Sequence, residues 1–283
     1  MISDKILKSI KNIPAFPAVA MKVMTLVDDP NYSIMDVADV VRYDQAIAAN
    51  ILRICNSAYF GLRHKVVTIN DAVMRLGQQN IIRAVQAAGV SQFYNKAKGY
   101  GLDANKLWEH SVGVAMMTQI LSKRIFNCED AKLYTIALLH DIGKVIMGEF
   151  VDESLQQIHS LVSKEGISFL DAEKKVIGIN HAELGGRIAS QWNFPQDMKD
   201  AIVFHHRPDL LTDSENAAAW LVYLADQACI MMGIGLGSDG LAYKGLSEVI
   251  TKFKLRQKDF EECIMLMLED LNRAREVIGM VSV

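Results

Sequence analysis

The sequence predicts an all-α protein, and three observations support that fold class. Apolar residues recur at helical spacing through most of the chain, as they do between Ile47 and Cys55. Side chains that cap helices, such as Ser33 and Asp103, precede several of these stretches. Strand-like alternation is scarce, and its best candidate, residues 65–69, is too short to build a sheet. We therefore expect a multi-helix bundle with an N-terminal helical subdomain.

The first hundred residues predict short helices separated by polar or proline-containing breaks. Pro17 starts a helix that ends near Val27, before the breaking sequence at residues 28–31. Ser33 caps a helix over residues 34–42, and another helix covers residues 45–56. Either Asn70 or Asp71 caps a turn that ends at Gly77, and a helix follows at residues 81–94.

The rest of the chain predicts longer helices. Residues 98–101 indicate a hinge, after which Asp103 caps a helix over residues 106–126. Further helices are expected near residues 130–140, 152–164, 168–177, 182–192, 196–206, 215–232 and 258–278. The last should pack back on the core through Phe260, Ile264, Leu268 and Leu271, with a dimer contact as the alternative. Residues 235–240 match GxGxxG, but no strand precedes them, so they predict a loop.

Charge is distributed unevenly along the chain. Residues 1–100 contain 12 Lys or Arg and seven Asp, without any Glu, whereas residues 101–283 contain 18 Lys or Arg and 26 Asp or Glu. The difference favours units with different surfaces, although local packing is an alternative cause. We divide the chain into an N-terminal helical subdomain (1–101), a metal-binding helical subdomain (102–233) and a C-terminal loop with helices (234–283). The basic residues are dispersed rather than clustered, which disfavours nucleic-acid binding.

Composition and motifs favour a cytoplasmic protein without a membrane anchor. The four cysteines are far apart and form no CxxC pair, which disfavours a zinc ribbon or a redox pair. Cys55, Cys229 and Cys263 lie in apolar helical stretches, which is typical of reduced core thiols. The first residues lack the apolar run of a secretory signal peptide. The apolar stretch 217–237 carries Asp226 near its centre, which disfavours a membrane span.

The candidate functional residues are histidines and aspartates on successive predicted helices. His140 and Asp141 are adjacent at the end of an apolar helical run, which we expect Gly143 to stop. Imidazole and carboxylate both suit Zn, Fe or Mn. Further candidate ligands, each in a predicted helix, are His110, His181, His205, His206 and Asp226. A helical bundle builds a metal site in this way, although each histidine taken alone could simply pack in the core.

The candidate ligands resemble the signature of the HD superfamily of metal-dependent phosphohydrolases. His110, His140-Asp141 and Asp226 follow its order, and His181 with His205 or His206 matches the histidines that its dinuclear branch adds. Residues 139–144, Leu-His-Asp-Ile-Gly-Lys, are similar to the form found in HD-GYP cyclic-di-GMP phosphodiesterases. After His206 that branch continues toward a Gly-Tyr-Pro element, and this sequence contains no such tripeptide.

The N-terminal part resembles the HDOD domain, the HD-related output domain of bacterial signalling proteins. The similarity extends over roughly residues 5–210. The segments that carry it are Ile13-Pro14-Ala15-Phe16-Pro17, Asp29-Pro30, Tyr43-Asp44-Gln45, Asn56-Ser57-Ala58-Tyr59-Phe60-Gly61 and Ala72-Val73-Met74-Arg75-Leu76-Gly77. Many HDOD proteins have lost the HD ligands and are thought to act by interaction, whereas this chain has matching residues. The resemblance implies an all-α bundle of the HD-superfamily type.

Two functions follow from the resemblance. The first is a signal-transduction output protein that retains an HD metal site and binds a signalling protein or a phosphorylated small molecule. The alternative is an active metal-dependent phosphohydrolase that cleaves a nucleotide or cyclic-dinucleotide phosphoester. Both imply one or two divalent ions (Fe, Mn, Ni or Zn) per chain. In the enzyme Asp141 would bridge two metals and Lys144 would bind a phosphate oxygen, unless Lys144 is only a surface lysine. The sequence leaves the oligomeric state open.

Overall fold

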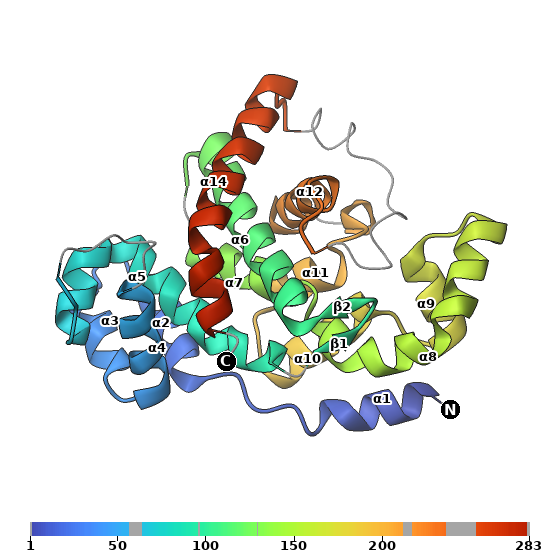
Figure 1. The fold of residues 1–283 in the computed structure, drawn as a ribbon, viewed down its shortest axis with the longest axis horizontal. Helices are drawn as coiled ribbons and strands as arrows, with labels where there is room; N and C mark the ends of the chain where they lie inside the picture. The colour runs from blue at the N-terminus through green and yellow to red at the C-terminus, as the bar shows by residue number, and fades with distance from the viewer. Residues whose placement is uncertain are drawn as a thin grey trace.

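Helices form almost all of the regular structure in the computed structural model, which describes residues 2–56, 64–95, 97–128, 130–211, 217–235 and 253–281 (Figure 1). The predicted all-α class is therefore confirmed. The helices are α1 (Ile2–Ile10), α2 (Ala18–Val27), α3 (Ile34–Val41), α4 (Gln45–Cys55), α5 (Ile69–Tyr94), α6 (Ala104–Phe126), α7 (Ala131–Leu139), α8 (Ile142–Glu165), α9 (Phe169–Ile177), α10 (His181–Gln191), α11 (Gln196–Val203), the 3-10 helix η1 (Pro208–Leu210), α12 (Ala217–Met231) and α14 (Gln257–Val281). Two short strands, β1 (Lys98–Gly99) and β2 (Leu102–Asp103), form the one sheet in the described part of the chain.

Short polar side chains start many of these helices, as the sequence predicted for α3 and α6. Ser33 accepts a hydrogen bond from the Met35 amide at 3.2 Å, and the Ser33 amide donates to Asp36 at 2.7 Å, which forms a capping box. Asp103 accepts from the Lys106 amide at 2.8 Å. These bonds satisfy backbone donors that the first helical turn would otherwise leave unpaired.

Helix α5 begins and bends at positions that differ partly from the prediction. Thr68, rather than Asn70 or Asp71, is the N-cap, and its hydroxyl accepts from the Asp71 amide at 3.1 Å. Gly77 has a φ of 73° and a ψ of 169°, so it interrupts the helix where the sequence predicted the end of a turn. Glycine tolerates this backbone conformation because it has no Cβ.

Helix α8 begins at Ile142, so the prediction that Gly143 stops the preceding helix is wrong. The expected start near residue 152 is wrong for the same reason. His140 is the C-cap of α7, and Asp141 is the N-cap of α8. Gly143 lies in the first turn of α8, where an added Cβ would stand 1.9 Å from the His181 carbonyl oxygen. This glycine therefore serves the close approach of α8 to α10 rather than helix termination.

Residues 98–103 form a hairpin instead of the predicted hinge. Lys98 pairs with Asp103 in the antiparallel ladder, and Tyr100 at the turn is 1% exposed. The hairpin touches α8 so closely that a Cβ on Gly148 would lie 1.6 Å from the Lys98 carbonyl oxygen. Residues 65–69, which the sequence indicated were too short to build a sheet, form no strand in the described part of the chain, and Ile69 begins α5.

Figure 1 shows how the chain places its helices. Helices α2, α3 and α4 pack around α5, while α6 and α7 occupy the centre and α8 and α9 extend to the other side. Helix α14 lies along α6 and also contacts α4, which confirms that the C-terminal helix packs back on the core. Helix α1, which the sequence analysis did not predict, lies against α8.

Two sequence predictions fall partly or wholly outside the described residues. They concern residues 236–240 of the GxGxxG match and the start of the 215–232 helix. None of the helices that the structure describes has the length and apolarity needed to cross a membrane.

Candidate metal centre

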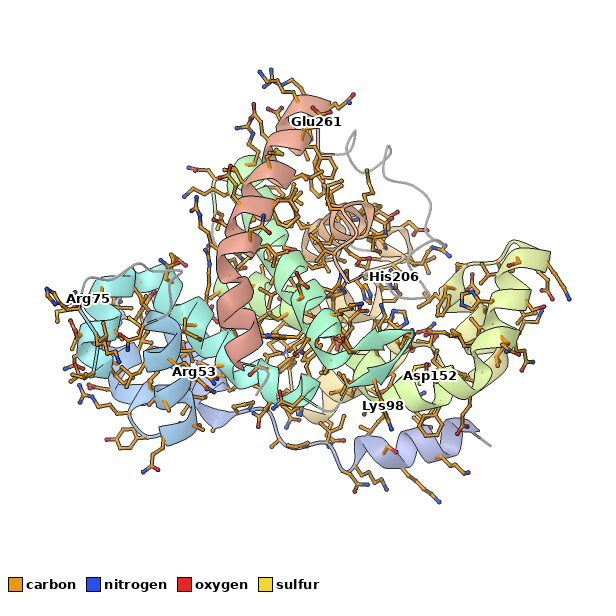
Figure 2. All side chains as sticks on the ribbon, viewed as in Figure 1. Arg53, Arg75, Lys98, Asp152, His206 and Glu261 are labelled. Atoms are coloured by element: carbon orange, nitrogen blue, oxygen red, sulfur yellow. The ribbon has the colours of Figure 1, made fainter. Side chains whose placement is uncertain are left out.

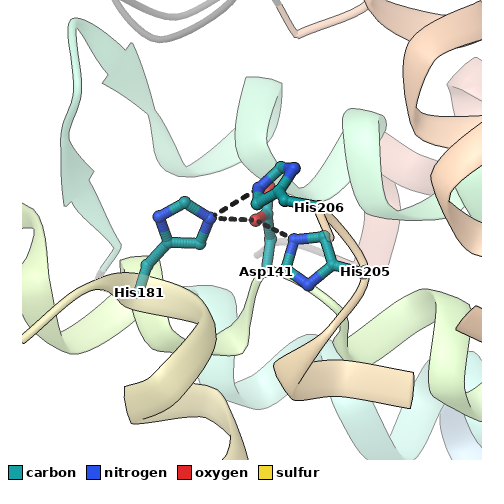
Figure 3. A group of neighbouring side chains, drawn as sticks. All are labelled: Asp141, His181, His205 and His206. Carbon is teal, nitrogen blue, oxygen red and sulfur yellow. Dashed lines mark hydrogen bonds and ion pairs between the residues drawn. The ribbon is translucent and has the colours of Figure 1, made fainter. Parts of the chain in front are cut away.

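The seven candidate ligands meet in the interior of the molecule. His110 comes from α6, His140 and Asp141 from the α7–α8 junction, His181 from the start of α10, His205 and His206 from the turn after α11, and Asp226 from α12. Each is at most 6% exposed. Figure 2 places His206 among the central helices, and Figure 3 shows four of the seven side chains converging. The prediction that the helix extends through residue 206 is wrong, because α11 ends at Val203.

Asp141 is the common neighbour of four histidines. Its Oδ1 lies 3.5 Å from His181 Nε2 and 3.7 Å from His205 Nε2 (Figure 3). Its Oδ2 lies 3.4 Å from His140 Nε2 and 3.8 Å from His110 Nε2. Two atoms that each bind one ion at about 2.1 Å lie about 3–3.5 Å apart, so these spacings are close to those of shared ligands.

The ligand atoms form two overlapping sets that share Asp141. One set contains Asp141, His181, His205 and His206, and the other contains His110, His140 and Asp141, with the atoms of each set within 4.8 Å of one another. Asp226 adjoins both sets: its Oδ1 is 3.0 Å from His110 Nε2, and its Oδ2 is 3.7 Å from His206 Nδ1. The arrangement can therefore hold one ion or two.

Outer hydrogen bonds fix the orientation of four imidazoles. Nδ1 donates to a backbone carbonyl in His110 (Ile234, 3.0 Å), His140 (Ala137, 2.7 Å) and His205 (Ile202, 2.6 Å), and to the Glu173 carboxylate in His181 (2.7 Å). Carbonyl and carboxylate oxygens only accept, so the ring proton of each neutral imidazole lies on Nδ1. In His140 and His205 the lone pair on Nε2 then faces the interior of the cluster, as in a metal-ligating histidine. His110 Nε2 lies 3.0 Å from Asp226 Oδ1, and His181 Nε2 lies 2.8 Å from His206 Nε2.

The cluster leaves buried polar atoms unsatisfied. Within the described residues, His140 Nε2 and His205 Nε2 make no hydrogen bond, although both face an Asp141 carboxylate that also only accepts. Burial lowers the pKa of His205, so adding a proton to Nε2 to satisfy the facing carboxylate is unfavourable. A cation between these acceptors would satisfy them all. Imidazole nitrogen and carboxylate oxygen suit divalent Zn, Fe, Mn or Ni, and the residues therefore fit a metal ion.

Lys144 stands at the edge of the cluster. It is 5% exposed, its Nζ lies 2.7 Å from Asp141 Oδ2, and it sits 5.6 Å from the centroid of the Tyr100 ring. The alternative of a solvated surface lysine is therefore wrong. Burial would raise the pKa of Asp141, but the charge of Lys144 and the contacts with His140 outweigh it and hold that pKa well below its usual value.

Glu173 and Tyr100 belong to the site and were missed by the sequence analysis. Glu173 is fully buried; it accepts a hydrogen bond from the Tyr100 hydroxyl at 2.5 Å and bonds from both the ring and the amide of His181, at 2.7 and 3.1 Å. The sequence contains an indication that Glu173 is buried: it follows Phe169 by four residues and so shares the buried face of α9. No comparable signal linked Tyr100 to a residue 73 positions away.

Comparisons with known proteins identify similar chains. A sequence model of the HDOD domain matches residues 13–208. An uncharacterized protein of Treponema pallidum (strain Nichols) is 25% identical over 209 residues, which are 72% of this chain and 40% of that protein. This chain therefore spans less than half of its relative's length.

Two solved structures share the fold. An HDOD domain protein of Geobacter sulfurreducens aligns with a TM-score of 0.74 and 24% identity, covering 99% of this chain and 96% of its own. A candidate signal-transduction protein of Marinobacter aquaeolei VT8 aligns with a TM-score of 0.76 and 20% identity, covering 96% of this chain and 60% of its own.

Proposed function

Because the chain belongs to the HDOD domain family, we propose that it is a bacterial signal-transduction output protein that retains an HD-type metal centre. It acts in the cytoplasm by binding a signalling protein or a phosphorylated small molecule. The observation that carries the proposal is the approach of four histidine Nε2 atoms to within 3.8 Å of the Asp141 carboxylate. The name of the Marinobacter protein, a candidate signal-transduction protein, agrees with this role.

The proposed ligands divide between two ion positions. One position would be held by Asp141, His181, His205 and His206. The other would be held by Asp141, His110 and His140, and Asp226 is near enough to complete it. An ion at either position would tie together helices from distant parts of the chain. The deep burial of all seven side chains favours a role in holding this conformation over one in turnover.

Metal-dependent stabilisation tests the proposed centre. After chelator treatment, adding Mn²⁺, Fe²⁺, Ni²⁺ or Zn²⁺ to the wild-type protein should raise its free energy of unfolding by about 2.7 kcal/mol at one hundred times Kd. His181→Gln should abolish most of that gain. The control His159→Gln changes an exposed histidine of α8 outside the cluster and should keep it. An equal gain in His181→Gln, or no gain in the wild type, would refute the centre.

Phosphoester hydrolysis is the second candidate function, and the buried Lys144 beside Asp141 favours it. A bound divalent ion supplies an activated water and polarises a phosphoryl group. Lys144 would bind a phosphoryl oxygen of a nucleotide or cyclic dinucleotide as a point charge. Glu173 would keep the His181 ring oriented, and Asp141 would hold its carboxylate between the two sets of histidines.

An assay with bis(p-nitrophenyl) phosphate separates the two functions. An enzyme should turn over this diester with at least one of the four metals. It should lose most of that turnover in Asp141→Asn and Lys144→Met while both variants stay folded. An output protein should bind metal and show no turnover with any of them. Metal binding and turnover of the diester are thus measured separately.

A further inference from the structure

We propose that Tyr100 controls access to the candidate metal centre, an inference that rests on the proposed function because it concerns the same site. The tip of the β1–β2 hairpin, residues 100–101, must move this side chain aside before an ion or a phosphorylated ligand can enter. Every candidate ligand is at most 6% exposed, so an occupant needs a path that the closed conformation lacks. Movement of a short loop commonly opens such a path in proteins with buried sites.

The hairpin lies between solvent and the histidine cluster. Gly101 and Asp103 are exposed, whereas Tyr100 is 1% exposed. The Tyr100 ring meets the His181 ring edge-on, with 6.2 Å between the centroids, and Lys144 Nζ lies 5.6 Å from the centroid of the Tyr100 ring. Figure 1 shows the hairpin beside α8, where it leads into α6. Tyr100 therefore closes the cluster on the side of His181 and Lys144.

The hairpin has little stability of its own, so the Tyr100 side chain determines whether its tip stays docked. The ladder has two residue pairs, between residues 98–99 and 102–103, and so short a hairpin is marginally stable in water. Both turn residues have a positive φ, 61° for Tyr100 and 71° for Gly101. Such a turn favours Asn-Gly, because the left-handed conformation is unfavourable for tyrosine. The contacts of the Tyr100 side chain must offset that cost.

The two oxygens of the Glu173 carboxylate hold different partners. Its Oε1 accepts the hydrogen bond from the Tyr100 hydroxyl at 2.5 Å, and its Oε2 accepts from the ring and the amide of His181 at 2.7 and 3.1 Å. Removing the hydroxyl therefore leaves both bonds to His181 in place. A hydrogen bond to a carboxylate is about twice as strong as one between neutral groups. Its loss should raise the population of the open hairpin about tenfold or more.

Carbethoxylation of the metal-free chain by diethyl pyrocarbonate measures access to the cluster. The reagent acylates neutral imidazoles that it can reach, and peptide mass spectrometry gives the rate for each histidine. In the wild type His181 and His206 should react slowly, and the exposed His159 should react quickly. Tyr100→Phe should raise the rates at His181 and His206 about tenfold or more and leave the rate at His159 unchanged. Tyr100→Asn removes the ring, suits the left-handed turn and should raise both rates further.

Tyr94→Phe is the matched control. Tyr94 is also 1% exposed, and its hydroxyl donates to the Leu138 carbonyl at 2.8 Å, a bond between α5 and α7 that does not involve the hairpin. His181 and His206 should stay as unreactive in this variant as in the wild type. Near-ultraviolet circular dichroism checks that each variant is folded. The proposal is overturned if folded Tyr100→Phe and Tyr100→Asn react at the wild-type rates, or if Tyr94→Phe exposes the two histidines equally.

Exchange of Zn²⁺ with a chromophoric chelator gives a second readout. Tyr100→Phe should speed both the loss of Zn²⁺ and its reloading about tenfold, because the same opening serves both directions. Faster loss with slower reloading would mean that Tyr100 only orients a ligand, and would overturn the proposal. A chain that shows the predicted carbethoxylation rates but binds no metal would refute the proposed centre and support the control of access by Tyr100. A chain that binds metal but reacts at wild-type rates in both Tyr100 variants would refute that control alone.

Discussion

A buried ion pair, Lys144 with Asp141, lies within the proposed metal site. The two charged atoms are 2.7 Å apart, and both side chains are almost fully buried. Such a pair offsets the desolvation of each partner, so removing one partner leaves an uncompensated charge. A metal ion beside Asp141 would provide alternative compensation.

We predict that Lys144→Met destabilises the metal-free protein by about 3–5 kcal/mol and the metal-loaded protein by less. Urea denaturation with and without metal measures both values. The control Lys174→Met breaks an exposed pair with Glu183 at 2.5 Å and should cost less than about 1 kcal/mol. An equal loss for Lys144→Met in both forms would mean that no cation compensates Asp141.

The Glu173 carboxylate positions the His181 ring, and a substitution of Glu173 tests this role. Glu173→Gln puts an amide where three donors now converge, so at least one of them loses its acceptor. We expect metal affinity to fall about 10–100-fold, as happens when groups that orient metal ligands are changed. Competition with a chromophoric chelator measures the affinity. Glu183→Gln, a change at a more exposed carboxylate on α10, is the control, and equal affinities in both variants would exclude this positioning role.

The sequence predicted side-chain chemistry better than side-chain partners. All seven candidate ligands converge, as expected from their residue types and their order along the chain. Spacing carried no information on the bond between Tyr100 and Glu173, which depends on how the hairpin docks on the helices. Lys144 was ambiguous for the same reason, since its burial depends on where α8 begins.

At the scale of elements, the close contact of α8 with α10 positions two parts of the candidate metal centre. Asp141 precedes α8 and His181 begins α10, and the two helices meet at Gly143. An added Cβ there would collide with backbone, which cannot move aside as a flexible side chain can. In the sequence alone Gly143 indicates a helix stop, because glycine serves both purposes and only the packing distinguishes them.

We predict that Gly143→Ala destabilises the protein by about 3 kcal/mol and weakens metal binding. Gly166→Ala is the control, because an added Cβ there meets nothing within 4 Å and only the positive φ of 66° is unfavourable. That control should cost about 1 kcal/mol and leave metal affinity unchanged. Thermal denaturation and metal titration measure the two effects. Gly143→Ala behaving like Gly166→Ala would show that α8 and α10 can separate without consequence.

Ion pairs connect helix α14 to α6. Asp259 in its first turn pairs with Arg256 at 2.8 Å and also with Arg124 of α6. Hydrogen bonds from Arg256 and Arg124 hold the pKa of Asp259 well below its usual value. A lowered folded-state pKa contributes stability above the unfolded value of about 3.9, and this contribution is lost as the pH falls further.

We therefore predict that the stability difference between wild type and Asp259→Asn is largest near neutral pH and shrinks below about pH 4. Denaturation of both proteins from pH 7 to pH 3 measures this difference. Subtracting the variant's free energy of unfolding from that of the wild type removes the effect of the other carboxylates. A difference that is constant over this range would mean that the ion pairs do not hold α14.

At the scale of the whole molecule, helices from distant parts of the chain contact one another in ways that composition did not predict. The change in charge near residue 100 indicated separate units, and the division at residues 101 and 233 stays a prediction. Across the first boundary, α1 lies against α8, while α14 reaches α4. Helical periodicity predicts each element, whereas these long-range contacts follow from the packing of complementary faces.

The metal content of the purified protein tests the central claim most directly. Elemental analysis of the wild-type chain should find about one or two equivalents of Fe, Mn, Ni or Zn. His140→Ala should lose most of this metal, and His64→Ala, which changes an exposed histidine far from the cluster in sequence, should retain it. A wild-type protein that is purified without metal and cannot be reloaded with any of these ions would contradict the claim, and its buried histidines would then serve packing alone.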